Sequence, residues 1–169
     1  MSKCLVIIDV QNDYMSTGKV PCFKAEETKA KVITLGKQFI TNNYHVVLVQ
    51  HVAPKGAPFF EEGTDGDKLC EDLVSAFPEA KVVKKTHASS FIGTNLNTIL
   101  GELKVTEIYT CGLLTQNCVL FTCLDKEAQK YHPKMVVDCV TSITELVNAI
   151  AIGGSSDFVS QITSDKIFN

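Results

Sequence analysis

The sequence predicts an α/β fold in three α/β/α layers: a Rossmann-like, mostly parallel sheet of about five or six strands with helices on both faces. Short β-branched runs alternate along the chain with amphipathic segments of helical length, the pattern of strands joined by crossover helices. The first run, 5–9, is apolar until Asp9, as in a parallel strand buried on both faces. With 169 residues, 45% of them hydrophobic, the chain is expected to form one domain over 1–169.

The later elements follow from the same local patterns. Residues 24–43 place apolar side chains at helical spacing, and HVVLVQ predicts a strand over 45–50. The segment 53–67 is rich in proline, glycine and acidic residues and is expected to be a loop. The remaining predictions are helices over 67–77, 94–104, 115–131 (from an N-cap at Thr115) and 145–152, strands over 80–85, 105–112 and 134–140, and a short strand or helical turn over 157–160.

Composition argues against several classes of function. The net charge is −3 and no basic run is longer than Lys84-Lys85, so a nucleic-acid partner is not expected. No apolar run approaches membrane length and no signal peptide is evident, which predicts a soluble, cytoplasmic protein with no membrane partner. Seven cysteines without a secretory signal favour free thiols, and their spacing does not match a structural zinc site. Without a GxGxxG or P-loop pattern, no nucleotide cofactor is expected.

Chemically potent side chains follow three of the predicted strands at their carboxyl ends, where parallel sheets place their sites. Asp9 ends the first strand, Lys84 and Lys85 end the third, and Cys118 follows the fourth; if these strands are neighbours, the side chains converge. Asp9 is either a turn cap or a general base, and spacing alone does not choose between the two lysines.

Cys118 follows a glycine-containing corner, about one turn into the predicted helix over 115–131. The helix amides are expected to lower the pKa of its thiol and to hold an oxyanion, whereas the alternative is a buried cysteine packing the first turn. His51 and His87 are the histidines near this edge, and a Cys–His dyad with His87 is a further possibility.

Three segments, LVIIDVQNDY (5–14), KTHASSFIGTNL (85–96) and CGLLTQNCV (111–119), together resemble the isochorismatase-like cysteine hydrolase family, over almost the whole chain. The resemblance selects Lys85, six residues before Phe91, and implies a triad of Asp9, Lys85 and Cys118 that hydrolyses a small amide or ureide through a thioester. It also implies an oxyanion hole from the backbone amides of Leu114 and Cys118, a cis peptide between Leu113 and Leu114, and a homo-oligomer, dimer or tetramer.

The chain departs from nicotinamidase relatives at the metal site that the resemblance implies. His51 is present, but Gln50 and Val52 replace the carboxylate and the second histidine, so no metal and no other cofactor is expected. The segments after the second and fifth strands are short, which predicts a pocket that is open or completed by a partner subunit. Phe59, Phe60 and Phe91 are candidate pocket residues for a small-molecule substrate.

Three alternatives remain open at this point. The first is a nicotinamidase with an altered metal site, which would require a divalent metal. The second is a non-enzymatic family member that acts as an interaction or scaffold protein. The third is a thiol redox sensor that pairs Cys118 with Cys111.

Overall fold

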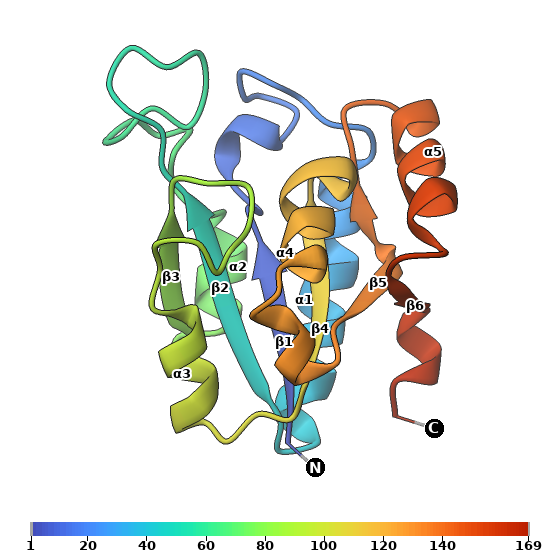
Figure 1. Ribbon diagram of the computed structural model, residues 1–169. Coiled ribbons are helices and arrows are strands. Elements are labelled where there is room, and N and C mark those ends of the chain that lie inside the picture. Colours follow the sequence, from blue (N-terminus) through green and yellow to red (C-terminus); the bar gives the residue numbers. More distant parts are fainter. Residues whose placement is uncertain (1, 169) are drawn as a thin grey trace.

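The computed structural model describes residues 2–168 and has the predicted three-layer α/β architecture (Figure 1). Six parallel strands form one sheet in the order β3-β2-β1-β4-β5-β6. The strands are β1 (Lys3–Ile8), β2 (His45–His51), β3 (Lys81–Lys85), β4 (Glu107–Leu113), β5 (Lys134–Thr141) and β6 (Ser160–Ile162). The helices are α1 (Ala25–Thr41), α2 (Glu71–Ala76), α3 (Leu96–Glu102), α4 (Leu120–Leu124) and α5 (Glu145–Ser155).

Two apolar cores fill the spaces between the layers. Helices α1 and α2 cover one face of the sheet, and α3 and α4 cover the other (Figure 1). Because successive strand residues point to opposite faces, β1 contributes Leu5 and Ile7 to the first core and Val6 and Ile8 to the second. From Leu5 to Ile8 the central strand is therefore apolar and buried on both faces, as the sequence predicts.

The strands that carry Asp9, Lys85 and Cys118 are expected to be neighbours in the sheet, and the observed order differs in one respect. β1 and β4 are adjacent, but β3 lies at the sheet edge with β2 between it and β1. The chain reverses its winding direction at β1, so the crevice at the carboxyl ends of β1 and β4 is the topological switch point of the sheet.

The prediction of one long helix over 115–131 is wrong. The segment instead forms a π-helical turn (Thr115–Val119), the short helix α4 and a 3₁₀ turn (Ala128–Tyr131). Helix α4 ends before Asp125, whose backbone is extended and whose carboxylate accepts hydrogen bonds from Ser89 Oγ at 2.5 Å and the Glu127 amide at 2.9 Å. These bonds hold the chain out of the helical path that its local sequence favours.

The other element boundaries differ by smaller amounts. Helix α2 begins at Glu71 rather than near residue 67, because the preceding residues are tied to the β1 end: the Gln11 side chain donates to the Asp67 carbonyl at 2.7 Å. The last strand begins at Ser160, at the end of the segment where either a strand or a helical turn is predicted.

Candidate active site

The switch point brings together the three predicted side chains and a histidine. Asp9 directly follows β1, Cys118 lies in the π-helical turn after β4, and Lys85 is the last residue of β3. Lys85 pairs in register with His51, the last residue of β2, so its long side chain reaches across the end of β2 toward Asp9. Lys85 is buried whereas Lys84 is exposed, so alternation along β3 separates the two lysines that sequence spacing leaves equivalent.

The Lys85 ammonium is the centre of the site. Its Nζ lies 2.9 Å from Asp9 Oδ2, 3.0 Å from His51 Nδ1, 3.1 Å from Cys118 Sγ and 3.1 Å from the His87 carbonyl oxygen. An ammonium group has three N–H donors, so four acceptors compete for them. The cation therefore holds the carboxylate and the sulfur close together, each within hydrogen-bond reach of itself.

Asp9 is fully buried and is held by a single cation. Apart from the ion pair with Lys85, neither carboxylate oxygen has a hydrogen-bond partner among residues 2–168. Burying a carboxylate with so few donors is costly, and buried polar groups are nearly always satisfied. The unfilled acceptor positions are thus available to a proton or an N–H group brought into the site.

The protonation states of the buried groups follow from their surroundings. Burial raises the pKa of the Cys118 thiol and the Asp9 carboxylate raises it further, while the Lys85 ammonium lowers it. Burial opposes the charge on Lys85, but the Asp9 carboxylate and the hydrogen bonds to Asp9 and Cys118 outweigh it, so the pKa of Lys85 is raised. The predicted lowering of the Cys118 pKa is therefore wrong for the resting site, where burial and the Asp9 carboxylate outweigh the Lys85 ammonium.

The His51 ring accepts a hydrogen bond from the Lys85 ammonium. The sequence does not predict this contact. Burial lowers the pKa of His51 and the Lys85 cation lowers it further, so the imidazole is neutral near pH 7. Because the ammonium can only donate, Nδ1 accepts the hydrogen bond and the ring proton resides on Nε2. The sequence shows a histidine at a strand end, but not that its ring contacts the lysine.

Gln11 fixes the backbone of His51 from the far side of the β1 end. Its side-chain amide donates to the His51 carbonyl at 2.9 Å, and its Oε1 accepts from the His51 amide at 2.8 Å. Gln11 is fully buried and lies two residues after Asp9. The one feature of the sequence that could have indicated this role of Gln11 is its position in the DVQND segment, two residues after Asp9.

The candidate pocket residues differ in their relation to the site. The Phe60 ring lies 5.8 Å from the His51 ring and 4.6 Å from the Tyr14 ring, and Phe59 lies 5.1 Å from Phe60. These aromatics line the His51 side of the triad, and Tyr14 joins them without having been predicted. Phe91 instead stacks on Tyr131 at 6.3 Å, so the contact that the structure gives it is one of packing.

The turn that carries Cys118 is anchored on both sides. The Leu113–Leu114 peptide is cis, as the family resemblance implies. The Thr115 hydroxyl contacts the Thr141 carbonyl at 3.0 Å and Asn148 Oδ1 at 2.6 Å, rather than capping a helix. Cys118 is 2% exposed, so it does not lie in the open pocket that the short segments predict.

Whether the site fits a divalent metal can be tested on its donor atoms. Asp9, His51 and Cys118 offer ligand atoms that all lie within 4.8 Å of one another. Each of the three already contacts the Lys85 ammonium at 2.9–3.1 Å. A divalent cation bound to this set would lie beside that buried positive charge, so the donor set does not fit a metal while Lys85 is protonated.

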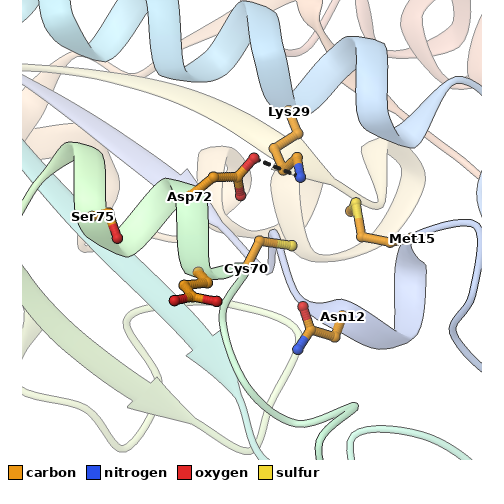
Figure 2. A pocket seen from close by; sticks show the side chains of 7 residues that line it. Asn12, Met15, Lys29, Cys70, Asp72 and Ser75 are labelled. Atoms are coloured by element: carbon orange, nitrogen blue, oxygen red, sulfur yellow. Dashed lines mark ion pairs between the residues drawn. The ribbon is translucent and has the colours of Figure 1, made fainter.

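The other cysteines have different surroundings. Cys111 lies in the core on the opposite face of the sheet from Cys118, which argues against a disulfide between the two. Cys70 borders a hollow of about 550 Å³ between α1 and α2, beside the Lys29–Asp72 ion pair of 2.7 Å (Figure 2). Burial raises the pKa of Cys70 to about 11.

Comparisons with known proteins point to one family. The family model described as the isochorismatase domain matches residues 3–165. The secreted isochorismatase effector Isc1 of Verticillium dahliae is 35% identical over 172 residues, covering 98% of this chain and 89% of the effector.

Within residues 2–168, no helix combines the length and the apolar character needed to cross a bilayer.

Solved structures with the same fold include a hydrolase and a nicotinamidase. A putative isochorismatase hydrolase from Oleispira antarctica superposes with a TM-score of 0.89 at 25% identity, covering 98% of this chain and 95% of that one. The nicotinamidase PncA from Bacillus subtilis superposes with a TM-score of 0.84 at 24% identity, covering 95% and 99% of the two chains.

Proposed function

The chain belongs to the isochorismatase family of hydrolases, and from this premise we propose that it cleaves the C–N bond of a small amide or ureide with Cys118 as nucleophile. The observation that carries the proposal is the contact of one buried ammonium, Lys85, with both Asp9 and Cys118. A nucleophile, a base and a fixed cation within hydrogen-bond reach form the arrangement that acyl transfer requires.

The first half-reaction uses the unpaired acceptor capacity of Asp9. As the Cys118 sulfur attacks the substrate carbonyl carbon, its proton passes to the Asp9 carboxylate. Lys85 stabilises the negative charge that develops on the sulfur and stays protonated throughout. The raised pKa of the thiol makes this transfer necessary, because little thiolate exists before the substrate binds.

The carbonyl oxygen becomes an oxyanion, for which the backbone amides of Leu114 and Cys118 are the proposed donors. Collapse of this intermediate breaks the C–N bond, and the proton held by Asp9 passes to the leaving nitrogen. The product is a thioester on Cys118 with a free amine or ammonia. Water, deprotonated by Asp9, then attacks the thioester and releases the acid and the thiol.

A metal has no step in this proposal, since its donor atoms are already engaged by Lys85. A nicotinamidase with an altered metal site is the competing function in the same class. It predicts that nicotinamide is converted to nicotinate and that turnover stops when divalent metal is removed. The proposed function predicts turnover that chelation with EDTA leaves unchanged.

The test is a screen of small primary amides, ureides and nicotinamide, with ammonia release as the readout. Intact-protein mass spectrometry after rapid acid quench should show an acyl adduct on Cys118. Cys118→Ala should abolish both signals and keep the circular dichroism spectrum of the wild type. Hydrolysis by Cys118→Ala at the wild-type rate would reject the nucleophile, and a chain with no turnover and no adduct on any substrate would favour a non-enzymatic role.

A further inference from the structure

His51 has a free hydrogen-bond donor beside Lys85. Its Nδ1 accepts from the Lys85 ammonium at 3.0 Å, so the ring proton is on Nε2. No residue among 2–168 hydrogen-bonds with Nε2. In this part of the chain, the buried side-chain nitrogen and oxygen atoms without a hydrogen-bond partner are the two oxygens of Asp9, so Nε2 is not sealed inside the protein. A ligand that enters from solvent can therefore reach this N–H group.

The other side chains around Lys85 offer no free donor. The ammonium has three N–H groups and four acceptors within 3.1 Å, so all of its donors are engaged. An ionised Asp9 can only accept, and the proposed reaction passes the Cys118 proton to Asp9. Among the three side chains that contact the ammonium, His51 is thus the one whose donor is available to a substrate.

The surroundings hold the His51 ring in place. Gln11 fixes its backbone, donating to the His51 carbonyl at 2.9 Å and accepting from the His51 amide at 2.8 Å. The centroid of the Phe60 ring lies 5.8 Å from that of the imidazole. His51 is partly exposed, whereas Asp9 is fully buried and Cys118 is 2% exposed. The imidazole therefore forms part of the boundary between the buried reacting groups and solvent.

The charges near His51 favour an uncharged acceptor. Four ionisable groups act on the ring: Lys85, Asp9, His87 and Asp67. Lys85 is the one lysine among them, and its charge is already paired with Asp9. A carboxylate bound at Nε2 would have no lysine of its own and would lie near the Asp67 carboxylate, so its desolvation would not be offset. A carbonyl oxygen carries no such cost.

We propose that His51 is a specificity-determining residue whose Nε2–H donates a hydrogen bond to a second, uncharged carbonyl oxygen of the substrate, which selects neutral diamides and acyl ureas over simple amides. This inference rests on the proposed function, which assigns the oxygen of the scissile carbonyl to the amides of Leu114 and Cys118 and leaves the His51 donor for another acceptor. A site built to hydrogen-bond a substrate group rejects analogues that lack it, because its own polar group is then left unpaired.

Binding to Cys118→Ser, which keeps an acceptor for Lys85 but has a weaker nucleophile, separates recognition from hydrolysis. The probes are malonamide and succinamide, their apolar isosteres isovaleramide and isocaproamide, and the acids malonamate and succinamate, titrated at about pH 8, where histidine rings are uncharged. One diamide should bind about 5- to 10-fold more tightly than its isostere, the size of one neutral hydrogen bond. In two-bond ¹H–¹⁵N spectra that diamide should move the Nε2 resonance of His51, and its isostere should not.

Three further variants in the Cys118→Ser background test the residue itself. His51→Phe removes the donor but leaves Lys85 three acceptors for its three N–H groups, so it should keep its circular dichroism spectrum and lose the preference for the diamide. His51→Gln restores an acceptor and a donor and should recover the preference. The matched control is His45→Phe, at the first residue of β2 and thus the other end of the strand, which should leave binding unchanged.

Equal binding of each diamide and its isostere would overturn the inference. So would a preference that survives in His51→Phe, tighter binding of the acids, or a Cys118→Ser protein that binds neither diamide up to its solubility limit. If His51→Phe does not fold, the His51 resonance in Cys118→Ser decides alone. Failure of the proposed function has a different signature: the diamides bind through His51, yet the wild type releases no ammonia from them. Hydrolysis of simple amides with no preference for diamides would keep the proposed function and reject this inference.

Discussion

The substitution Asp9→Asn separates two effects that a buried carboxylate has on a neighbouring thiol. Asp9 raises the pKa of Cys118, so removing its charge while keeping its shape should make the thiol more acidic. The reacting atoms of the two residues lie within 4.8 Å. At an effective dielectric constant of about 20, one charge at that distance contributes about 3.5 kcal/mol, or about 2.5 pKa units.

The consequence is that Cys118 should become more reactive while the enzyme becomes inactive. The fraction of thiolate rises as its pKa falls, but its nucleophilicity decreases with its basicity, which leaves a gain of about 20-fold in alkylation rate near pH 7. Hydrolysis should fall by at least about 100-fold, because no base takes the thiol proton or activates water.

The assay is the rate of iodoacetamide alkylation at each cysteine, read by peptide mass spectrometry from pH 5 to 9. Cys70, whose pKa is raised to about 11 by burial beside the Lys29–Asp72 ion pair, is the internal reference in every sample. Asp13→Asn is the matched control, because Asp13 is also buried but accepts from the Lys19 and Phe60 amides. Slower alkylation of Cys118 in Asp9→Asn than in the wild type would refute the reasoning, since Asp9 would then be promoting the thiolate at rest.

Three further predictions concern the groups around the triad. Lys85→Met should shift alkylation of Cys118 to higher pH and abolish hydrolysis, because Lys85 contacts the sulfur. Lys84→Met, at the exposed neighbouring position, should change neither the alkylation nor the hydrolysis. Equal effects of the two substitutions would reject the assignment of Lys85. The folded-state pKa of His51 is lowered, so the unfolded chain binds a proton there below about pH 6.5 that the folded chain does not, and stability falls as pH decreases through that range. Urea unfolding midpoints between pH 7.5 and 5.5 should therefore fall less for His51→Asn than for the wild type, and an identical fall would mean that His51 is charged in the folded protein. Gly112→Ala should lower the unfolding free energy by more than about 3 kcal/mol in urea titrations, because φ there is +110° and the added Cβ would lie 2.1 Å from a backbone oxygen of β1; near-wild-type stability would show that β4 can shift away.

The sequence determined the architecture because the apolar pattern of each strand leaves few ways to bury it. The run at 5–8 is apolar at every position, and only the centre of a sheet covered on both faces buries all of these side chains. The same pattern places Asp9 at the strand end, and the family motifs around Lys85 and Cys118 identify their partners. The structure places all three in contact, and their catalytic roles remain to be tested by the experiments above.

Tertiary structure decided what depends on contacts between distant segments. The segment around Asp125 has a sequence suited to a helix, yet its bond to Ser89 ends α4 early, and no local pattern shows that bond. His51 contacts Lys85 because β2 and β3 pair in a register that places these two residues side by side, and no local sequence pattern shows that register.

The protonation of Cys118 and the exposure of α5 have the same origin. A local pattern shows a thiol near a turn and a helix rich in apolar residues, but not how much water reaches either. Burial by the rest of the chain raises the pKa of the thiol, and the absence of any covering segment within residues 2–168 leaves Leu146 and Ile150 exposed. Both quantities are set by solvent access, which is a property of the packed molecule and not of any one segment.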